Sequence, residues 1–229
     1  GFTTNGTFFT DENVEKILTH RLDLVSTSIA GATAEVHQSL RVNSQLEEIL
    51  RGIENLLFHR KKNQGKAPKI AVSYMLVKEN IQELVSAVKM AHSLGVDDMY
   101  LTNLDYVFNE STNQSKVFTW NGEDVSFYEE IIREAKKYAK SKEFSFRTYP
   151  LKLGEEQPVC ELDPSKMVFI TAEGEITPCT YLGRFSNPRY FKDEFFEFPQ
   201  KTFGNIFKND FGEIWYSKAY QEFKKPFLK

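Results

Sequence analysis

The sequence has few cysteines, no long apolar run and little net charge. These absences exclude several classes of protein. The longest apolar-rich run, 70–77, is far too short to span a bilayer. A formal charge of −3 gives no reason to expect nucleic acid as a partner. With 41% apolar and 27% charged residues, the composition is neither that of a disordered tail nor that of a membrane protein. The opening GFTTNGTFFT lacks the features of a signal peptide, so we expect a cytoplasmic protein whose two cysteines stay reduced.

Common catalytic motifs are missing as well. The sequence contains no Walker A loop, no GxGxxG and no GxSxG, which argues against a nucleotide-binding loop and a serine-hydrolase elbow. The four histidines, His20, His37, His59 and His92, form no HExxH and no close cluster with cysteine. A zinc hydrolase is therefore disfavoured.

The first part of the chain alternates strand and helix patterns. Strands are predicted at 1–4, 22–29, 69–77, 98–103 and 144–149. A helix is expected from a capping box at Ser44-x-x-Glu47, another is expected to end at Gly95, and 109–123 is expected to be a polar loop. This alternation predicts an α/β fold with a parallel sheet and right-handed crossovers.

The composition changes after about residue 155. Ten of the 20 phenylalanines lie between Phe185 and Phe227, where aliphatic residues are scarce. We therefore predict two regions, 1–155 and 156–229. In the second we expect a β-hairpin across 167–177 with its turn at 172–174, and one last helix capped by Asp210. The Phe-rich stretch at 185–211 is predicted to form the core of a small subdomain rather than a docking surface.

Ligand sites in parallel sheets lie at the carboxyl ends of the strands. Small or polar residues follow the predicted strands there, at 4–6, 28–31, 78–80 and 102–103. Each segment could equally be a plain turn, and Asn80 in particular is either a turn residue or an amide that orients a ligand. Arg41, on one helical face with His37, could pair with an anionic ligand or with Glu35 or Glu47.

The two cysteines follow a spaced pattern. Cys160 is followed by thirteen residues, Gly174, four residues and Cys179, and the predicted hairpin folds the chain back between the thiols. Two thiolates supply half the ligands of an iron–sulfur cluster. Composition alone favours ordinary reduced thiols.

Taken in order, these segments resemble the radical S-adenosylmethionine (SAM) enzymes that carry a C-terminal SPASM or twitch-type iron–sulfur subdomain. The matching phrases cover nearly the whole chain: TTNGTFFTDENVEKIL, LVSTSIAGATAEVHQSLR, KIAVSYMLVKENIQELVSAVKMAHSLGVDDMYLTN, GEITPC and FGNIFKNDFGEIWYSKAYQEF. The resemblance implies an incomplete partial (β/α)6 barrel, entered at the end of its third strand, followed by a small, incomplete α+β subdomain. We expect a chain cut at both ends, because CxxxCxxC, the family's motif for the SAM-cleaving [4Fe–4S] cluster, is absent.

The resemblance also implies roles for particular residues. Thr4, Asn5, Ser28, Arg41, Thr102 and Asn103 match positions near SAM, and Cys160 and Cys179 match ligands of an auxiliary cluster. Ala30 departs from the family pattern, which has aspartate there, and this puts part of the SAM contact in doubt.

The implied cofactors are S-adenosylmethionine and [4Fe–4S] clusters, and the implied activity is SAM cleavage followed by hydrogen abstraction from a peptide or small molecule. We expect the 229 residues alone to be inactive, and we expect neither nucleic acid nor membrane as a partner. One alternative is a non-catalytic binding module derived from this family. A second alternative is an unrelated βα-barrel enzyme that binds an anion at 28–31.

Overall fold

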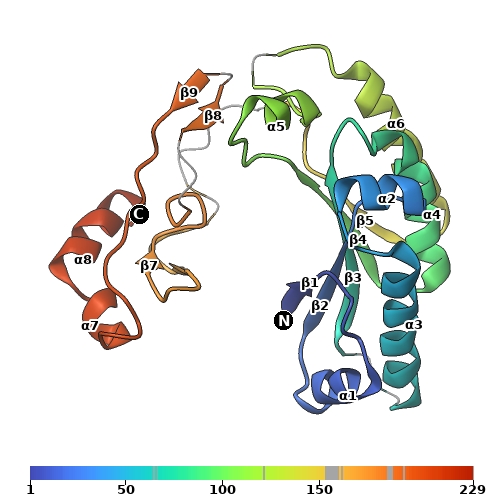
Figure 1. The fold of residues 1–229 in the computed structure, drawn as a ribbon, viewed down its shortest axis with the longest axis horizontal. Coiled ribbons are helices and arrows are strands. Elements are labelled where there is room, and N and C mark those ends of the chain that lie inside the picture. Colours follow the sequence, from blue (N-terminus) through green and yellow to red (C-terminus); the bar gives the residue numbers. More distant parts are fainter. Residues whose placement is uncertain are drawn as a thin grey trace. The chain divides into compact units, whose positions relative to one another are not determined.

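The computed structural model describes residues 1–63, 65, 67–120, 122–152, 160, 162–184, 188–192 and 194–228. The chain divides into two compact units (Figure 1). The first unit comprises residues 1–105 and 114–152, and the second comprises 106–113 and 153–229. The predicted boundary between 155 and 156 lies outside the described residues. No helix among the described residues is long and apolar enough to cross a membrane.

A five-stranded sheet forms the centre of the first unit. Its strands are β1 (Phe2–Thr4), β2 (Leu24–Ile29), β3 (Lys69–Leu76), β4 (Asp98–Asn103) and β5 (Ser145–Arg147). They pair in parallel, in sequence order from β1 to β5. The predicted α/β class with a parallel sheet is confirmed.

Helices connect these strands. They are α1 (Asp11–Thr19), α2 (Ala34–Leu40), α3 (Leu46–Lys62), the short 3-10 turn η1 (Ile81–Glu83), α4 (Leu84–Leu94) and α6 (Ser126–Ser141). Thr10 caps α1, since its side chain accepts a hydrogen bond from the amide of Asn13. Gly95 ends α4 as predicted, with the left-handed φ of 82° that glycine adopts without strain.

Two sequence predictions in this part need correction. The capping box at Ser44 is wrong: α3 begins at Leu46 after Gln45, and the Ser44 hydroxyl instead contacts the ring of His37. The predicted polar loop at 109–123 contains a short helix, α5 (Glu110–Ser115). In both places a tertiary or local hydrogen bond overrides the simple pattern, since Asn109 accepts bonds from the amide and hydroxyl of Thr112.

The core of the first unit lies between the sheet and its helices, and Figure 1 shows α3, α4 and α6 along one side of the strands. Side chains alternate between faces along a strand, so each strand sends every second residue to that side. The fully buried members from the central strands are Val25, Ile29, Ile70, Val72, Tyr74, Leu76 and Met99. Ile49, Ile53 and Leu56 of α3 pack against them.

The second unit consists of two small hairpins and short helices. Its elements are β6 (Phe169–Ile170), β7 (Ile176–Thr177), β8 (Arg189–Phe191), β9 (Glu194–Phe196), α7 (Phe211–Trp215), α8 (Lys218–Lys224) and η2 (Lys225–Phe227). The predicted hairpin is present as β6–β7, with Gly174 at a φ of 82° in its turn. The single last helix is wrong, because Tyr216 ends α7 and the Ser217 side chain caps a new helix, α8.

The core of the second unit is small. Its buried members are Ile176, Ile214 and Tyr220, with the ring of Phe203 stacked 4.3 Å from that of Tyr220. Most of the Phe-rich stretch lies outside this core, which corrects the prediction. The exposed phenylalanines among its described residues are Phe191, Phe195, Phe196, Phe207 and Phe211.

Candidate functional site

One face of the sheet carries several hydroxyl groups at neighbouring positions. Ser28 on β2 lies beside Ser73 on β3, and Ser73 lies beside Tyr100 on β4. The Ser28 and Ser73 hydroxyls are 2.8 Å apart, and the Ser26 hydroxyl lies 2.8 Å from that of Tyr100. Thr102 shares this face, two residues beyond Tyr100. The sheet is therefore two-sided, with an aliphatic face beneath the helices and a hydrogen-bonding face opposite.

The turn that follows β2 is held by a buried histidine. The Nδ1 atom of His37 accepts a hydrogen bond of 3.2 Å from the amide of Ala30. Because Nδ1 accepts, the proton of a neutral ring lies on Nε2, which is 3.0 Å from the Ser44 hydroxyl. Burial lowers the pKa of His37, and the positive charge of Arg41 lowers it further, against a smaller opposing effect of Glu47. His37 thus serves as a neutral support for the turn.

Asn80 fixes the same turn from the neighbouring strand. Its side chain is fully buried, and Nδ2 donates to the carbonyls of Ala30 at 3.0 Å and Met75 at 2.9 Å. Its Oδ1 accepts from the amide of Val77 at 3.0 Å. Both amide protons are committed to the backbone, so the alternative in which Asn80 orients a ligand directly is not supported. Its role is to tie the carboxyl ends of β2 and β3 together.

A carboxylate that sequence reasoning missed completes this support. Glu83 accepts hydrogen bonds from the amides of Ala32 at 2.7 Å and Thr33 at 3.1 Å. The Thr33 hydroxyl also donates to Glu83, at 2.6 Å. A negative charge at the start of α2 complements the helix dipole as well as its unpaired amides. The contact joins residues fifty positions apart, so no local sequence pattern predicts it.

Thr4 and Asn5 shape the turn after β1. The Thr4 hydroxyl accepts from the amide of Gly6 at 3.1 Å. Asn5 Oδ1 accepts from the amide and the hydroxyl of Thr7, at 3.2 Å and 2.9 Å. Gly6 has a φ of 80°, and a Cβ there would lie 2.7 Å from Thr27 Cγ2. The two predicted residues lie at the expected carboxyl end, with their oxygens already engaged in the turn.

Thr102 and Asn103 end β4, and both are half-buried. Thr102 is paired in register with Met75, and Asn103 with Leu76. Asn103 Nδ2 donates to the carbonyl of Pro150 at 2.9 Å, which leaves its Oδ1 available as an acceptor. The ends of β3 and β4 therefore carry one hydroxyl and one amide oxygen at the same edge of the sheet.

Arg41 is the candidate cation for an anionic ligand. It forms the C-cap of α2 and is half-buried, and burial lowers the pKa of its guanidinium. Within the described part of the chain, its side chain makes no hydrogen bond or ion pair, and neither Glu35 nor Glu47 pairs with it. A half-buried guanidinium in this state is suited to a carboxylate or phosphate ligand.

The two cysteines flank the β6–β7 hairpin of the second unit. Cys160 is exposed and Cys179 is half-buried. The carbonyl of Cys179 accepts from the Thr177 hydroxyl at 3.2 Å and from the amide of Gly183 at 3.0 Å, so its backbone is held firmly. Burial, with a smaller effect of Cys179, raises the pKa of Tyr220 to about 12. Cys179 is thus close to Tyr220 of the small core.

Two thiolates fit half of a cluster's ligand set. Iron–sulfur clusters are usually held by four protein ligands, mainly cysteine. Among the described residues no group of three or more His, Cys, Asp or Glu side chains is arranged to hold a metal. Since the sequence has two cysteines, the remaining thiolates of a four-cysteine set would have to come from outside these 229 residues.

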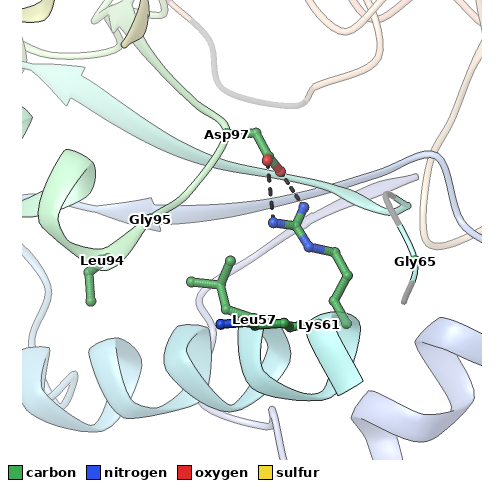
Figure 2. Close-up of a pocket in the computed structure, with 7 residues that line it drawn as sticks. Leu57, Lys61, Gly65, Leu94, Gly95 and Asp97 are labelled. Atoms are coloured by element: carbon green, nitrogen blue, oxygen red, sulfur yellow. Dashed lines mark hydrogen bonds and ion pairs between the residues drawn. The ribbon is translucent and has the colours of Figure 1, made fainter. Parts of the chain in front are cut away.

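A pocket of about 580 Å³ lies at the opposite edge of the sheet. It is lined by Leu57, Arg60, Lys61, Gly65, Leu94, Gly95 and Asp97. Arg60 forms an ion pair with the carboxylate of Asp97, which is labelled in Figure 2. The same carboxylate accepts from the amide of Ile70 at 2.7 Å. Asp97 precedes β4, so this pocket lies at the amino ends of the strands. Its ion pair ties the end of α3 to the sheet, and the hydroxyl face lies elsewhere.

The C-terminal part of the chain matches a known domain. Residues 160–229 match the SPASM family, described as an iron–sulfur cluster-binding domain. The match begins at Cys160 and includes Cys179, Gly174 and Gly204. The SPASM comparison therefore covers the segment that contains both candidate thiolates.

Longer relatives match nearly the whole chain. The tungsten-containing aldehyde ferredoxin oxidoreductase cofactor-modifying protein of Pyrococcus furiosus is 27% identical over 98% of this chain and 61% of its own length. The AdoMet-dependent heme synthase of Methanosarcina barkeri is 25% identical over 93% of this chain and 58% of its own length. This chain thus spans about three-fifths of the curated relatives that it matches.

Solved structures share the fold. Streptococcus suis SuiB, in a crystal structure with the precursor peptide SuiA, superposes with a TM-score of 0.61 and 16% sequence identity. The superposition covers 97% of this chain and 49% of SuiB. At this level of identity the likeness concerns the fold of the chain, and it extends through both units.

Proposed function

We propose, from the premise that this chain belongs to the radical SAM family and carries its SPASM domain, that the protein containing it cleaves S-adenosylmethionine. Hydrogen abstraction from a peptide or small-molecule substrate would follow. The observation that carries the proposal is the hydroxyl-lined face of the parallel sheet, with the turn at Ala30 fixed by His37, Asn80 and Glu83. The carboxyl edge of such a sheet is where ligands bind.

The residues at this edge supply complementary groups for S-adenosylmethionine. Arg41 would pair with the methionine carboxylate, because its guanidinium is half-buried and has no partner in the described chain. The Ser28 hydroxyl keeps capacity beyond its bond to Ser73, since a hydroxyl has one proton and two lone pairs. Thr102 and Asn103 would contact the adenine. Thr4 and Asn5 would shape the adjoining turn.

The bound groups would supply the chemistry that side chains lack. The electron for cleavage of S-adenosylmethionine would be supplied by a [4Fe–4S] cluster, and the family motif for that cluster is not among these 229 residues. Cys160 and Cys179 would contribute two ligands to a second cluster. The protein face itself binds, orients and excludes water. A cytoplasmic, reducing compartment would keep both thiols available as ligands.

A second candidate function is a binding module without catalysis. It is favoured by Ala30, which stands where the family pattern has aspartate. Ala30 is buried, and its amide and carbonyl are both bonded within the turn. The turn is thus complete without a carboxylate, and a ligand would have to be held by Ser28 and Arg41 alone at this position.

The test uses the full-length protein, reconstituted anaerobically with iron and sulfide, reduced, and assayed for methionine released from S-adenosylmethionine. We expect release, and we expect Arg41→Gln to raise the KM for S-adenosylmethionine about tenfold, as loss of a charge-assisted bond does. Arg133→Gln, an exposed arginine on α6, is the matched control and should leave KM unchanged.

Two outcomes would contradict parts of this proposal. Binding of S-adenosylmethionine without methionine release, in protein with full iron content, would favour the binding module. Methionine release by a protein of verified 229 residues would contradict the expectation that the family's absent cluster motif is required.

A further inference from the structure

The second unit contains a buried arginine on its outer hairpin. Arg189 is the first residue of β8, and it is paired in register with Phe196 on β9. The hairpin is anchored to the segment 106–113, because the amide of Tyr190 donates to the carbonyl of Val107 at 2.8 Å. The Tyr190 hydroxyl also donates to Glu110. Arg189 therefore has a well-defined place within its own unit.

Two aromatic rings lie against the Arg189 guanidinium. Its central carbon lies 5.0 Å from the ring centroid of Tyr106 and 4.7 Å from that of Phe198. The residue is 5% exposed. Cation–π contacts of this kind stabilise the positive charge. They provide no acceptor for the N–H groups along its edges.

The unpaired atoms lie on one edge. Nε and Nη2 of Arg189 are buried and have no hydrogen-bond partner among the described residues. In a guanidinium these two nitrogens direct parallel N–H bonds along the same side, which is the arrangement that receives two oxygens of one acceptor. Buried charged donors without acceptors are rare and cost free energy. The two N–H groups of this edge thus lack an acceptor among the described residues.

The surroundings add positive charge. The guanidinium carbon of Arg184 lies 4.9 Å from the same Tyr106 ring, so two cations share one aromatic group. No ion pair is formed by either arginine within the described part of the chain. An anion at the Nε–Nη2 edge would therefore compensate two charges, and its binding would be favoured by the low local polarity.

We propose that the Nε–Nη2 edge of Arg189 binds a carboxylate of the substrate. A carboxylate presents two oxygens in one plane to these parallel N–H bonds. A phosphate carries further oxygens out of that plane, and these would need room beside the Tyr106 and Phe198 rings. The assignment of this carboxylate to the substrate rests on the proposed function, whereas the carboxylate site itself does not.

The experiment titrates acetate into the full-length protein and follows the Nε–H resonance of Arg189 by ¹H–¹⁵N NMR, with arginine labelled. Acetamide is the neutral analogue and inorganic phosphate the tetrahedral anion. We expect acetate alone to shift the resonance to saturation. Equal shifts with phosphate, or no shift with acetate, would overturn the proposal, because either result removes the need for a planar acceptor.

Two variants test whether Arg189 is the residue that binds acetate. Arg189→Lys keeps the charge but loses the two-pronged edge, and we expect acetate affinity measured by calorimetry to fall at least tenfold. Arg184→Lys, on the same Tyr106 ring, is the matched control and should change affinity less than threefold. Equal losses in both variants would overturn the proposal in favour of a general positive surface. Circular dichroism and iron content establish that each variant is folded. If a variant does not fold, the NMR titration of the unmodified protein alone decides whether Arg189 binds acetate.

The source of the carboxylate is tested with peptides. A short peptide with an aspartate should compete with acetate at this site, and its asparagine counterpart should not. Competition by acetate-like small molecules but by neither peptide would identify a small carboxylated substrate. Acetate binding without methionine release would leave the carboxylate site standing and refute the proposed function instead.

Discussion

The two units of this chain are stabilised in different ways. The first has a continuous aliphatic core in which helices cover one face of a sheet, and residues such as Val72, Ile53 and Leu56 are fully buried. The second has three buried hydrophobic residues at its centre and relies on ring stacking, as between Phe203 and Tyr220. Aliphatic packing of the first kind supports a fold without further links.

Hydrogen bonds and a cation–π contact connect the elements of the second unit. Asn205 donates to the carbonyl of Glu173 and to the side chain of Glu175, each at 2.8 Å, and so closes the β6–β7 turn. Lys224 is buried, with its ammonium 3.6 Å from the Trp215 ring centroid and 3.1 Å from the Trp215 carbonyl. Small domains with little aliphatic core commonly need a metal or disulfide for stability. On the proposed function, Cys160 and Cys179 would supply two ligands of such a link.

The largest effect is expected from truncating the core of the first unit. Leu56→Ala should lower the free energy of unfolding by about 2–5 kcal/mol, since Leu56 is fully buried. Phe58→Ala on the same helix, where the side chain is 62% exposed, should change it by less than about 0.5 kcal/mol. Urea unfolding of both variants measures the contrast. Similar losses in the two variants would mean that α3 does not carry the core.

The cost of the same glycine-to-alanine substitution can be compared between the two units. Gly95 and Gly174 share a φ of 82°, but a Cβ at Gly174 would lie 2.5 Å from the Phe207 ring, whereas nothing lies within 4 Å at Gly95. Gly95→Ala should cost about 1 kcal/mol from backbone strain alone. Gly174→Ala should cost about 3 kcal/mol, because overpacking adds to that strain. Thermal unfolding monitored in each unit by hydrogen exchange tests this, and equal costs would show that the exposed Phe207 ring moves aside freely.

The smallest effect concerns an acidic residue at the start of β4. Burial alone would raise the pKa of Asp98, but hydrogen bonds from Arg147 and Ser145, with the charges of Arg147 and Lys69, lower it below its ordinary value. Its stabilisation is therefore present at neutral pH and is lost as the pH falls through the lowered value. Asp98→Asn should cost about 2 kcal/mol at pH 7, and the difference should shrink below about pH 4.

The check is urea unfolding of both proteins across this pH range. A cost that stays constant down to acid pH would contradict an ionised Asp98. Ser126→Ala, which removes the exposed hydroxyl that donates to Asp124, is a control expected to change stability little at any pH.

Local patterns predicted the sheet because they depend on neighbours in sequence. The strand at 98–103 and the stop at Gly95 were correct, since alternation and a left-handed cap are read within a few residues. The capping box at Ser44 failed because the hydroxyl contacts His37, seven residues away. The break at Ser217 was missed because both halves of the helix share one apolar pattern.

The candidate site was only partly predictable for the same reason. Strand order places Ser28, Thr102 and Asn103 at one edge, and sequence reasoning reached this placement. The contacts of Glu83 with Thr33 and of Asn80 with Ala30 join residues fifty positions apart, which no spacing rule reveals. The contacts of Arg189 with the Tyr106 and Phe198 rings also depend on tertiary packing. The roles of Cys160 and Cys179 remain predictions that rest on spacing and resemblance.

The central claim is that an iron–sulfur cluster held in part by Cys179 stabilises the second unit. The most direct test is hydrogen exchange of the full-length protein before and after anaerobic reconstitution with iron and sulfide, compared with Cys179→Ala. We predict that amides of residues 162–184 and 194–228 gain protection on reconstitution, that the sheet of the first unit changes little, and that the variant loses the gain. Equal protection of the second unit with and without iron, or an unchanged gain in the variant, would contradict the claim.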